Sequence, residues 1–320
     1  MAESENGVEH VAARLRAEIA KVIVGQERVV HDVVVALFAG GHVLLEGVPG
    51  TAKTLLVRAL SLALDASFKR VQFTPDLMPS DLVGLSMWNQ QTNAFDFRPG
   101  PLFAGLVLAD EINRSPAKTQ AALLEAMSER RITVDGEGHD LPPLFTVIAT
   151  QNPVEYEGTY PLPEAELDRF MLKVLVPYPE RDDEEGILER YARGFDAERS
   201  ATFGIEKVAT VEEVLALRRG LKDVIAEPSV LGYITDVIRA TRDTPTLMLG
   251  ASPRAAVALF QCARATAALD GRNFVTPDDV KAMTPACLRH RVVVSPELEV
   301  EGGTADDAVR SVLERVEVPR

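Results

Sequence analysis

Residues 47–54, GVPGTAKT, come within one letter of a loop that binds nucleotide phosphates: glycine, four residues, glycine, lysine and serine or threonine. The apolar run HVLLEG precedes the loop and the helical pattern KTLLVRALSLAL follows it. A strand–loop–helix of this kind directs backbone N–H groups and the positive helix end at phosphate oxygens. Lys53 would then neutralise the β- and γ-phosphates, and the Thr54 hydroxyl would ligate Mg²⁺. The alternative is a tight strand–helix turn with a surface lysine.

Ala52 is the residue that departs from this pattern, because it stands where glycine is usual. Alanine is compatible with the right-handed helical region, and there the substitution would cost little. It would be unfavourable only if the position needed a positive φ. We therefore expect Ala52 to have a right-handed helical backbone.

A second set of polar residues follows two further apolar runs. LVLADEIN ends in Asp110-Glu111, and FTVIATQNP ends in a polar cluster that contains Asn152. Adjacent side chains at a strand end point in different directions, so Asp110 suits a metal ligand and Glu111 a general base. An amide at Asn152 would orient the attacking water. The alternatives are solvated acids at a strand end and an Asn-Pro turn.

Two arginines complete this set. Arg169 precedes the last strand in PLPEAELDRF. In GASPRAAVALF, Ser252 is a helix cap and Pro253 the first helical residue, which puts Arg254 in the first turn. A cation is disfavoured at that end of a helix, which suggests an anionic partner. A local carboxylate is the alternative partner.

Five short apolar runs predict strands buried on both faces: HVLLEG, FKRVQF, GLVLAD, FTVIAT and MLKVLV. Helical patterns such as PAKTQAALLEAMSER separate several of them, which favours a parallel sheet with helices on both faces. Two intervals, at about 85–98 and 132–143, have alternating polar and apolar residues around turn signals and predict inserted β-hairpins. These hairpins are either surface features or projections that contact a substrate or the pore of an assembly.

The C-terminal part of the chain is expected to be a separate helical domain. Strand signals fade after PERDDEEG, and helix starts follow at Thr210, with Glu213 in a capping box, and at Thr276-Pro277. The predicted division is residues 1–206 and 207–320.

The composition restricts the partners. A net charge of −14 does not favour binding to nucleic acid. The two cysteines have no metal-binding spacing, and the N-terminus MAESENGVEH resembles neither a signal peptide nor a membrane span. We expect a cytoplasmic protein that is not inserted in a membrane.

Taken in order, these segments resemble the MoxR family of AAA+ ATPases. The matching segments are GVPGTAKT, LVLADEINR, ALLEAMSERRITVDG, ATQNPVEYEGTYPLPEAELDRF and GASPRA. The resemblance covers nearly the whole chain, and the family itself tends to have alanine at the position of Ala52. It implies a P-loop αβα core with a five-stranded parallel sheet, an all-helical lid, and ATP bound with Mg²⁺ at their junction.

The resemblance also implies roles for particular residues. Asn152 corresponds to sensor 1, Arg254 to sensor 2, and Arg169 to an arginine finger that acts on the neighbouring subunit. Val24 and Gly25, in VIVGQ, correspond to the segment beside the adenine. The phosphate loop comprises Gly47, Val48, Pro49, Gly50, Thr51, Ala52, Lys53, Thr54 and Leu55.

Partners follow from the resemblance alone. It implies rings, usually hexameric, that remodel or activate client proteins together with a protein containing a von Willebrand factor A domain. Two other functions remain open: a nucleotide-gated scaffold with little turnover, and the motor subunit of a metal-chelatase complex.

Overall fold

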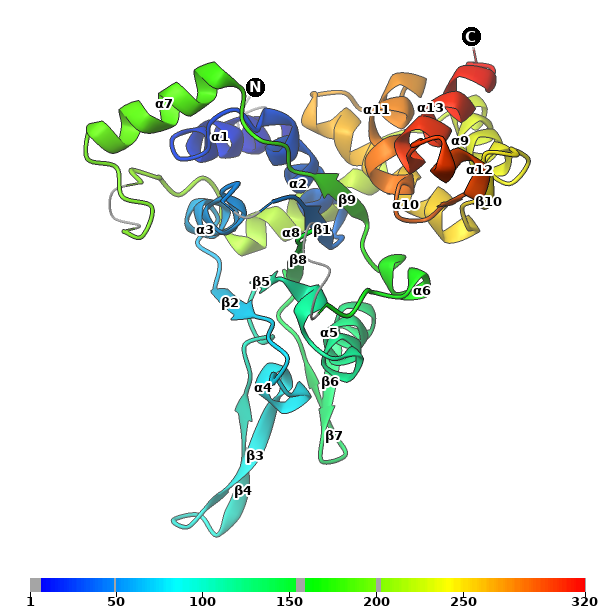
Figure 1. The fold of residues 1–320 in the computed structure, drawn as a ribbon. Coiled ribbons are helices and arrows are strands. Elements are labelled where there is room, and N and C mark those ends of the chain that lie inside the picture. The colour runs from blue at the N-terminus through cyan, green and yellow to red at the C-terminus, as the bar shows by residue number, and fades with distance from the viewer. Residues whose placement is uncertain (1–6, 49, 154–158, 200–202, 320) are drawn as a thin grey trace.

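The computed structural model describes residues 7–48, 50–153, 159–199 and 203–319. At its centre is a five-stranded parallel sheet in the order β2-β5-β8-β1-β9 (Figure 1). The strands are β1 (Val43–Glu46), β2 (Phe68–Gln72), β5 (Leu106–Asp110), β8 (Thr146–Gln151) and β9 (Leu172–Leu175). Each strand coincides with one of the five apolar runs, with β8 ending one residue beyond its run, so the predicted sheet is confirmed.

Helices cover both faces of this sheet. Successive residues of a strand point to opposite faces. On β5, Leu106 and Leu108 belong to one hydrophobic core and Val107 and Ala109 to a second. The first core includes α1 (Val8–Ala20), α2 (Glu27–Ala39) and α3 (Lys53–Ala63), and the second includes α4 (Pro79–Val83) and α5 (Ala117–Glu129).

Strand β2 differs from the expectation that every strand is buried on both faces. It is an edge strand of the sheet, where Val71 is buried but Lys69 and Arg70 are exposed. Its polar side chains are therefore available to the neighbouring ends of β5 and the phosphate loop.

Two antiparallel hairpins lie in the two intervals for which insertions were predicted, and both project from the same end of the molecule (Figure 1). They are β3 (Gly84–Asn89) with β4 (Ala94–Pro99), and β6 (Arg131–Val134) with β7 (Glu137–Asp140). Trp88 and Phe95 stack edge to face on the first hairpin, with ring centroids 5.2 Å apart, and both are exposed.

The remaining elements connect the sheet to the C-terminus. They are η1 (Ile112–Arg114), α6 (Glu164–Leu167), α7 (Arg181–Ala192), α8 (Val211–Gly220), η3 (Leu221–Asp223), α9 (Pro228–Ala240), β10 (Leu247–Leu249), α10 (Pro253–Leu269), α11 (Pro277–Leu288), β11 (Val293–Val294), α12 (Pro296–Val300) and α13 (Ala305–Arg315). Within the described ranges, every helix is too short or too polar to cross a lipid bilayer.

The C-terminal region is mainly helical, as predicted, but it is not wholly so, because β10 and β11 pair antiparallel. Thr210 and Thr276 both cap helices, as expected, and both form capping boxes, although a capping box was predicted only at Thr210. Helix α10 packs against α1 and α2, so the C-terminal helices share a hydrophobic core with the sheet domain. The boundary at 206/207 stays a prediction.

Candidate functional site

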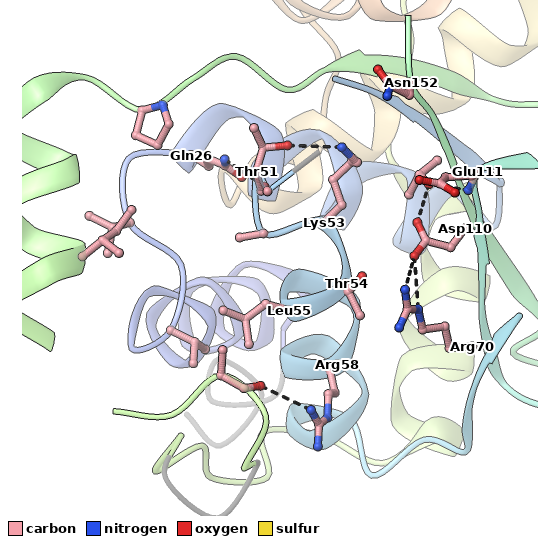
Figure 2. Close-up of a pocket in the computed structure, with 18 of the residues that line it drawn as sticks. Gln26, Thr51, Lys53, Thr54, Leu55, Arg58, Arg70, Asp110, Glu111 and Asn152 are labelled. Atoms are coloured by element: carbon pink, nitrogen blue, oxygen red, sulfur yellow. Dashed lines mark hydrogen bonds and ion pairs between the residues drawn. The ribbon is translucent and has the colours of Figure 1, made fainter. Parts of the chain in front are cut away.

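A cavity of about 500 Å³ lies between the phosphate loop, the carboxyl ends of β5 and β8, and the segment from α7 to Ala197 (Figure 2). This volume suits a ligand of nucleotide size. The polar lining residues include Thr51, Lys53, Thr54, Asp110, Glu111 and Asn152. Residues that are separate in the sequence therefore meet at one place, the edge where parallel strands end.

Two glycines shape the loop for different reasons. A Cβ at Gly47 would lie 2.5 Å from the carbonyl oxygen of Val176, so the close approach of the segment after β9 excludes a side chain. Gly50 has φ +85° and open space around it, so its backbone conformation is what favours glycine. Pro49 lies outside the described residues.

Ala52 has φ +56° and ψ +18°, and the expectation of a right-handed helical backbone is wrong. It is the residue immediately before α3, where the loop turns so that its backbone leads into the first helical turn. Left-handed geometry costs an L-residue about 1–2 kcal/mol. The alanine is thus a strained residue in the loop.

Lys53 folds back over the loop. Its Nζ donates to the carbonyl oxygens of Gly47 at 2.9 Å and Val48 at 2.7 Å, and lies 3.3 Å from Thr51 Oγ1. Burial lowers the pKa of the Lys53 ammonium, while the negative charges of Asp110 and Glu111 act in the opposite direction. Both carboxylates are therefore close enough to interact with the lysine, as the phosphate-loop prediction requires.

Asp110 ends β5 and is almost fully buried. Its Oδ1 accepts a hydrogen bond from Thr150 Oγ1 at 2.6 Å, and its Oδ2 accepts from Arg70 Nη2 at 2.6 Å and Arg70 Nε at 3.1 Å (Figure 2). Thr150 and Arg70 therefore fix the orientation of the carboxylate. Sequence reasoning missed both residues.

Glu111 follows β5 with a left-handed backbone, φ +56°, and its N–H donates to Thr150 Oγ1 at 2.8 Å. Its Oε2 accepts from Gln72 Nε2 at 2.6 Å and from Arg114 Nη1 at 2.9 Å. Strained backbone of this kind is often found at functional sites. Gln72, on the edge strand, was also not found from the sequence.

Asp110 and Thr54 could hold Mg²⁺. Magnesium prefers oxygen ligands and is usually held by one or two carboxylates together with substrate phosphates. Both side chains line the cavity, and Asp110 is a buried carboxylate whose present charge partner is the Arg70 guanidinium. The residues therefore fit a cation at this point. Asn152, which is buried just after β8, lines the same part of the cavity.

The other end of the cavity is apolar. Val22 and Val24 line the cavity together with Ile187, Tyr191 and Phe195, which come from α7 and the turn after it. Their composition suits a planar base. Gly25 does not line the cavity. Val24 does line it, as the family resemblance implied, whereas Ile187, Tyr191 and Phe195 were not predicted from the sequence.

Helix α7 is held in place by Arg190. Its Nη1 donates to Lys21 O at 2.6 Å and its Nη2 to Ala20 O at 3.0 Å. All residues that line the cavity precede position 198. Helix α7 and the residues up to Ala197 therefore close this side of the cavity, and the described C-terminal helices contribute no lining residue. The predicted location of the nucleotide at the junction of core and helical lid stays a prediction.

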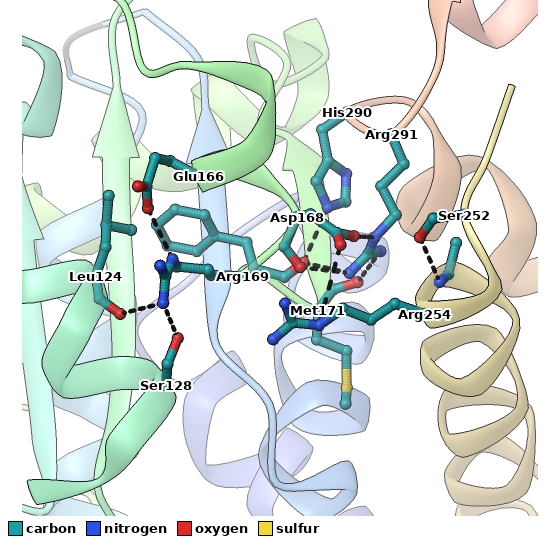
Figure 3. A network of polar contacts seen from close by, with 12 residues as sticks. Leu124, Ser128, Glu166, Asp168, Arg169, Met171, Ser252, Arg254, His290 and Arg291 are labelled. Atoms are coloured by element: carbon teal, nitrogen blue, oxygen red, sulfur yellow. Dashed lines mark hydrogen bonds and ion pairs between the residues drawn. The ribbon is translucent and has the colours of Figure 1, made fainter. Parts of the chain in front are cut away.

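The two predicted arginines lie away from this cavity. Arg169 Nε contacts Glu166 Oε2 at 2.7 Å, and its Nη1 donates to Leu124 O at 3.2 Å and to Ser128 Oγ (Figure 3). Arg254 is 61% exposed, and its Nε lies 3.9 Å from Asp168 Oδ2. Arg254 thus contacts the residue that precedes Arg169 in the chain.

Known proteins resemble this chain along most of its length. Residues 42–172 match the model of the ATPase family associated with various cellular activities, and residues 239–312 match the AAA lid domain. Chaperone MoxR1 of Mycobacterium tuberculosis is 38% identical over 97% of this chain and 83% of that protein. YeaC of Bacillus subtilis is 46% identical over 94% of this chain and 92% of that protein.

A solved structure has the same fold. The crystal structure of a candidate ATPase from Cytophaga hutchinsonii superimposes with a TM-score of 0.89 at 37% identity, and covers 99% of this chain and 98% of that one. Magnesium-chelatase subunits are more distant, as a subunit from Arabidopsis thaliana is 32% identical over 65% of this chain and 49% of that protein.

Proposed function

This chain belongs to the MoxR family of AAA+ ATPases, and we propose that its cavity binds ATP with Mg²⁺ and hydrolyses it to ADP and phosphate. The observation that supports these residue roles most strongly is the meeting of Lys53, Asp110, Glu111 and Asn152 in one cavity. Lys53 begins α3, Asp110 and Glu111 stand at the end of β5, and Asn152 follows β8.

The roles of the residues follow from their positions. The loop N–H groups and the Lys53 ammonium bind the β- and γ-phosphates. Thr54 and Asp110 would hold Mg²⁺, which would supply positive charge to the triphosphate. Glu111 accepts a proton from the attacking water, whose oxygen bonds to the γ-phosphorus as the bond to the ADP oxygen breaks. Asn152 orients that water. To accept this proton at Oε2, Glu111 must first break its hydrogen bond to Gln72 or to Arg114.

Arg169 and Arg254 serve a neighbouring subunit. Neither lines the cavity of its own chain, and Arg254 lies 3.9 Å from the carboxylate of Asp168, the residue that precedes Arg169 in the chain. A ring in which each subunit presents this surface to the next cavity would supply two cations to the developing phosphate charge. We favour a hexamer, which is the usual state of such rings.

The work done by the ring is the remodelling or activation of a client protein. One relative is named a chaperone, and a protein with a von Willebrand factor A domain is the partner that the family suggests. The hairpin carrying Trp88 and Phe95 offers an exposed apolar contact for such a client. The chelatase alternative is weaker, because those relatives match less of the chain.

Mixing two inactive variants tests this proposal. Glu111→Gln should remove the base and Arg169→Ala the shared cation, so each pure ring should be inactive. In equal mixtures, a cavity with Glu111 meets a neighbour with Arg169 in about a quarter of sites, so about a quarter of wild-type turnover should return.

The controls separate this function from its rivals. Native mass spectrometry must show mixed rings. Mixed rings without recovered turnover would refute the shared site, and steady turnover by Glu111→Gln alone would support a different base. A wild-type protein that binds ATP but does not turn it over would be a nucleotide-gated scaffold.

A further inference from the structure

Three consecutive residues that follow α11 contact one short segment of the sheet domain. Arg289 Nη1 donates to Lys173 O at 3.2 Å, and His290 Nε2 lies 2.9 Å from Phe170 O. Arg291 contacts the same segment around Asp168. That segment runs from the end of α6 into β9 and contains Arg169. The residues after α11 therefore hydrogen-bond to the backbone on either side of the proposed shared arginine.

Arg291 makes most of these contacts. Its Nε donates to Asp168 Oδ1 at 2.6 Å, and its Nη2 donates to Phe170 O at 2.7 Å and lies 3.3 Å from Asp168 O (Figure 3). Its Nη1 donates to Met171 O at 2.9 Å and to Cys287 O at 2.5 Å. All three nitrogens of the guanidinium are engaged.

Because Arg291 is buried, its guanidinium needs all of these hydrogen-bond partners to remain in place. The Arg291 side chain is 3% exposed, and the cost of desolvating its charge is offset only while the carboxylate and carbonyl partners stay in place. The planar fork of arginine satisfies several acceptors at fixed angles, which the single ammonium of lysine cannot do. A shift of the Asp168–Met171 backbone would leave buried polar groups without partners.

The contacts also relate the two surface arginines to each other. Arg291 holds Oδ1 of Asp168, and Arg254, in the first turn of α10, faces Oδ2 of the same carboxylate. Arg169 is the next residue in the chain. One buried guanidinium thus sets the position of a carboxylate that contacts Arg254 and belongs to the residue before Arg169.

We propose that Arg291 is a positioning residue, which locks the Asp168–Arg169 segment to the C-terminal helices so that Arg169 and Arg254 reach the neighbouring subunit's nucleotide together. This inference rests on the shared site proposed above. Because Arg291 links the C-terminal region to this segment, a displacement of the C-terminal helices would change hydrolysis in the next subunit. It would not change nucleotide binding in its own cavity.

The test substitution is Arg291→Lys, which keeps the positive charge but removes the planar guanidinium and its several N–H donors. Turnover at saturating ATP should fall about tenfold or more, since a misplacement of about 1 Å can cost as much as 100-fold. The dissociation constant for a fluorescent ADP should stay within about twofold of wild type, because the cavity lies elsewhere.

Arg272→Lys is the matched control. Arg272 also binds a buried aspartate through two guanidinium nitrogens, since Nη1 and Nη2 donate to Asp279 at 2.7 Å and 2.6 Å. That pair lies within the C-terminal region and touches neither surface arginine. Both variants should unfold at lower temperature than wild type, but only Arg291→Lys should lose turnover.

The decisive measurement mixes Arg291→Lys with Glu111→Gln. The Arg291→Lys subunits have intact cavities, so turnover should return in mixed rings, as with Arg169→Ala. If Arg291→Lys does not assemble, Asp168→Asn replaces it, because it removes the carboxylate charge and keeps the side-chain shape.

The outcomes separate the two proposals. If turnover returns with Arg169→Ala but not with the Arg291→Lys or Asp168→Asn subunits, the positioning role is overturned and the shared site stands. Unchanged turnover in pure Arg291→Lys rings overturns the positioning role as well. If turnover returns with neither partner, the shared site fails and this inference fails with it.

Discussion

Replacing Ala52 with glycine should not destabilise the protein, because its φ of +56° is unfavourable for any residue with a Cβ. Relief of left-handed strain contributes about 1–2 kcal/mol. The greater backbone entropy of an unfolded glycine opposes this by about 0.5–1 kcal/mol. Ala52 is half-buried against the first hydrophobic core, so loss of its methyl removes part of the gain. The net expectation lies between no change and about 1 kcal/mol of added stability.

Ala121→Gly supplies the comparison. Ala121 is exposed in the middle of α5, where the same substitution should cost about 1 kcal/mol. Urea unfolding of wild type and both variants is followed by circular dichroism at equal protein concentration. The free energy of unfolding should fall for Ala121→Gly, and it should stay unchanged or rise for Ala52→Gly. If Ala52→Gly lowers the free energy of unfolding as much as Ala121→Gly does, the strained loop is refuted.

Two further predictions concern the apolar end of the cavity and a buried acid. Tyr191→Ala should weaken ATP and ADP binding by about 1–2 kcal/mol through lost contact with the base, and should leave inorganic triphosphate binding unchanged in competition titrations. An equal loss for triphosphate would contradict the base assignment.

Burial raises the pKa of Asp32 to about 6, although Arg28 opposes the shift. The Asp32 carboxyl therefore loses its proton at a lower pH in the unfolded chain than in the folded protein. Stability should therefore fall as pH rises from about 4 to about 6. Asp32→Asn should be more stable at pH 7 by up to about 3 kcal/mol and should lose that advantage below about pH 4, which unfolding curves at both pH values would check.

The sequence by itself determined the elements whose signal is local. The five strands were found because each is a short apolar run. The caps at Thr210 and Thr276 were found because the residues that signal each helix start lie within three positions of the threonine. The phosphate loop and the acids after β5 were found for the same reason. Each of these patterns is complete within a few residues, so no distant contact is needed to recognise it.

Only the tertiary structure decided which distant residues meet. Arg70 lies 40 positions from its partner Asp110, and Arg291 lies 123 positions from Asp168. The apolar end of the cavity depends on where α7 packs, and the separation of Arg254 from its own cavity depends on where the C-terminal helices dock. The positive φ of Ala52 likewise follows from how the loop joins α3. These features arise from packing between elements, which one-dimensional periodicity does not encode.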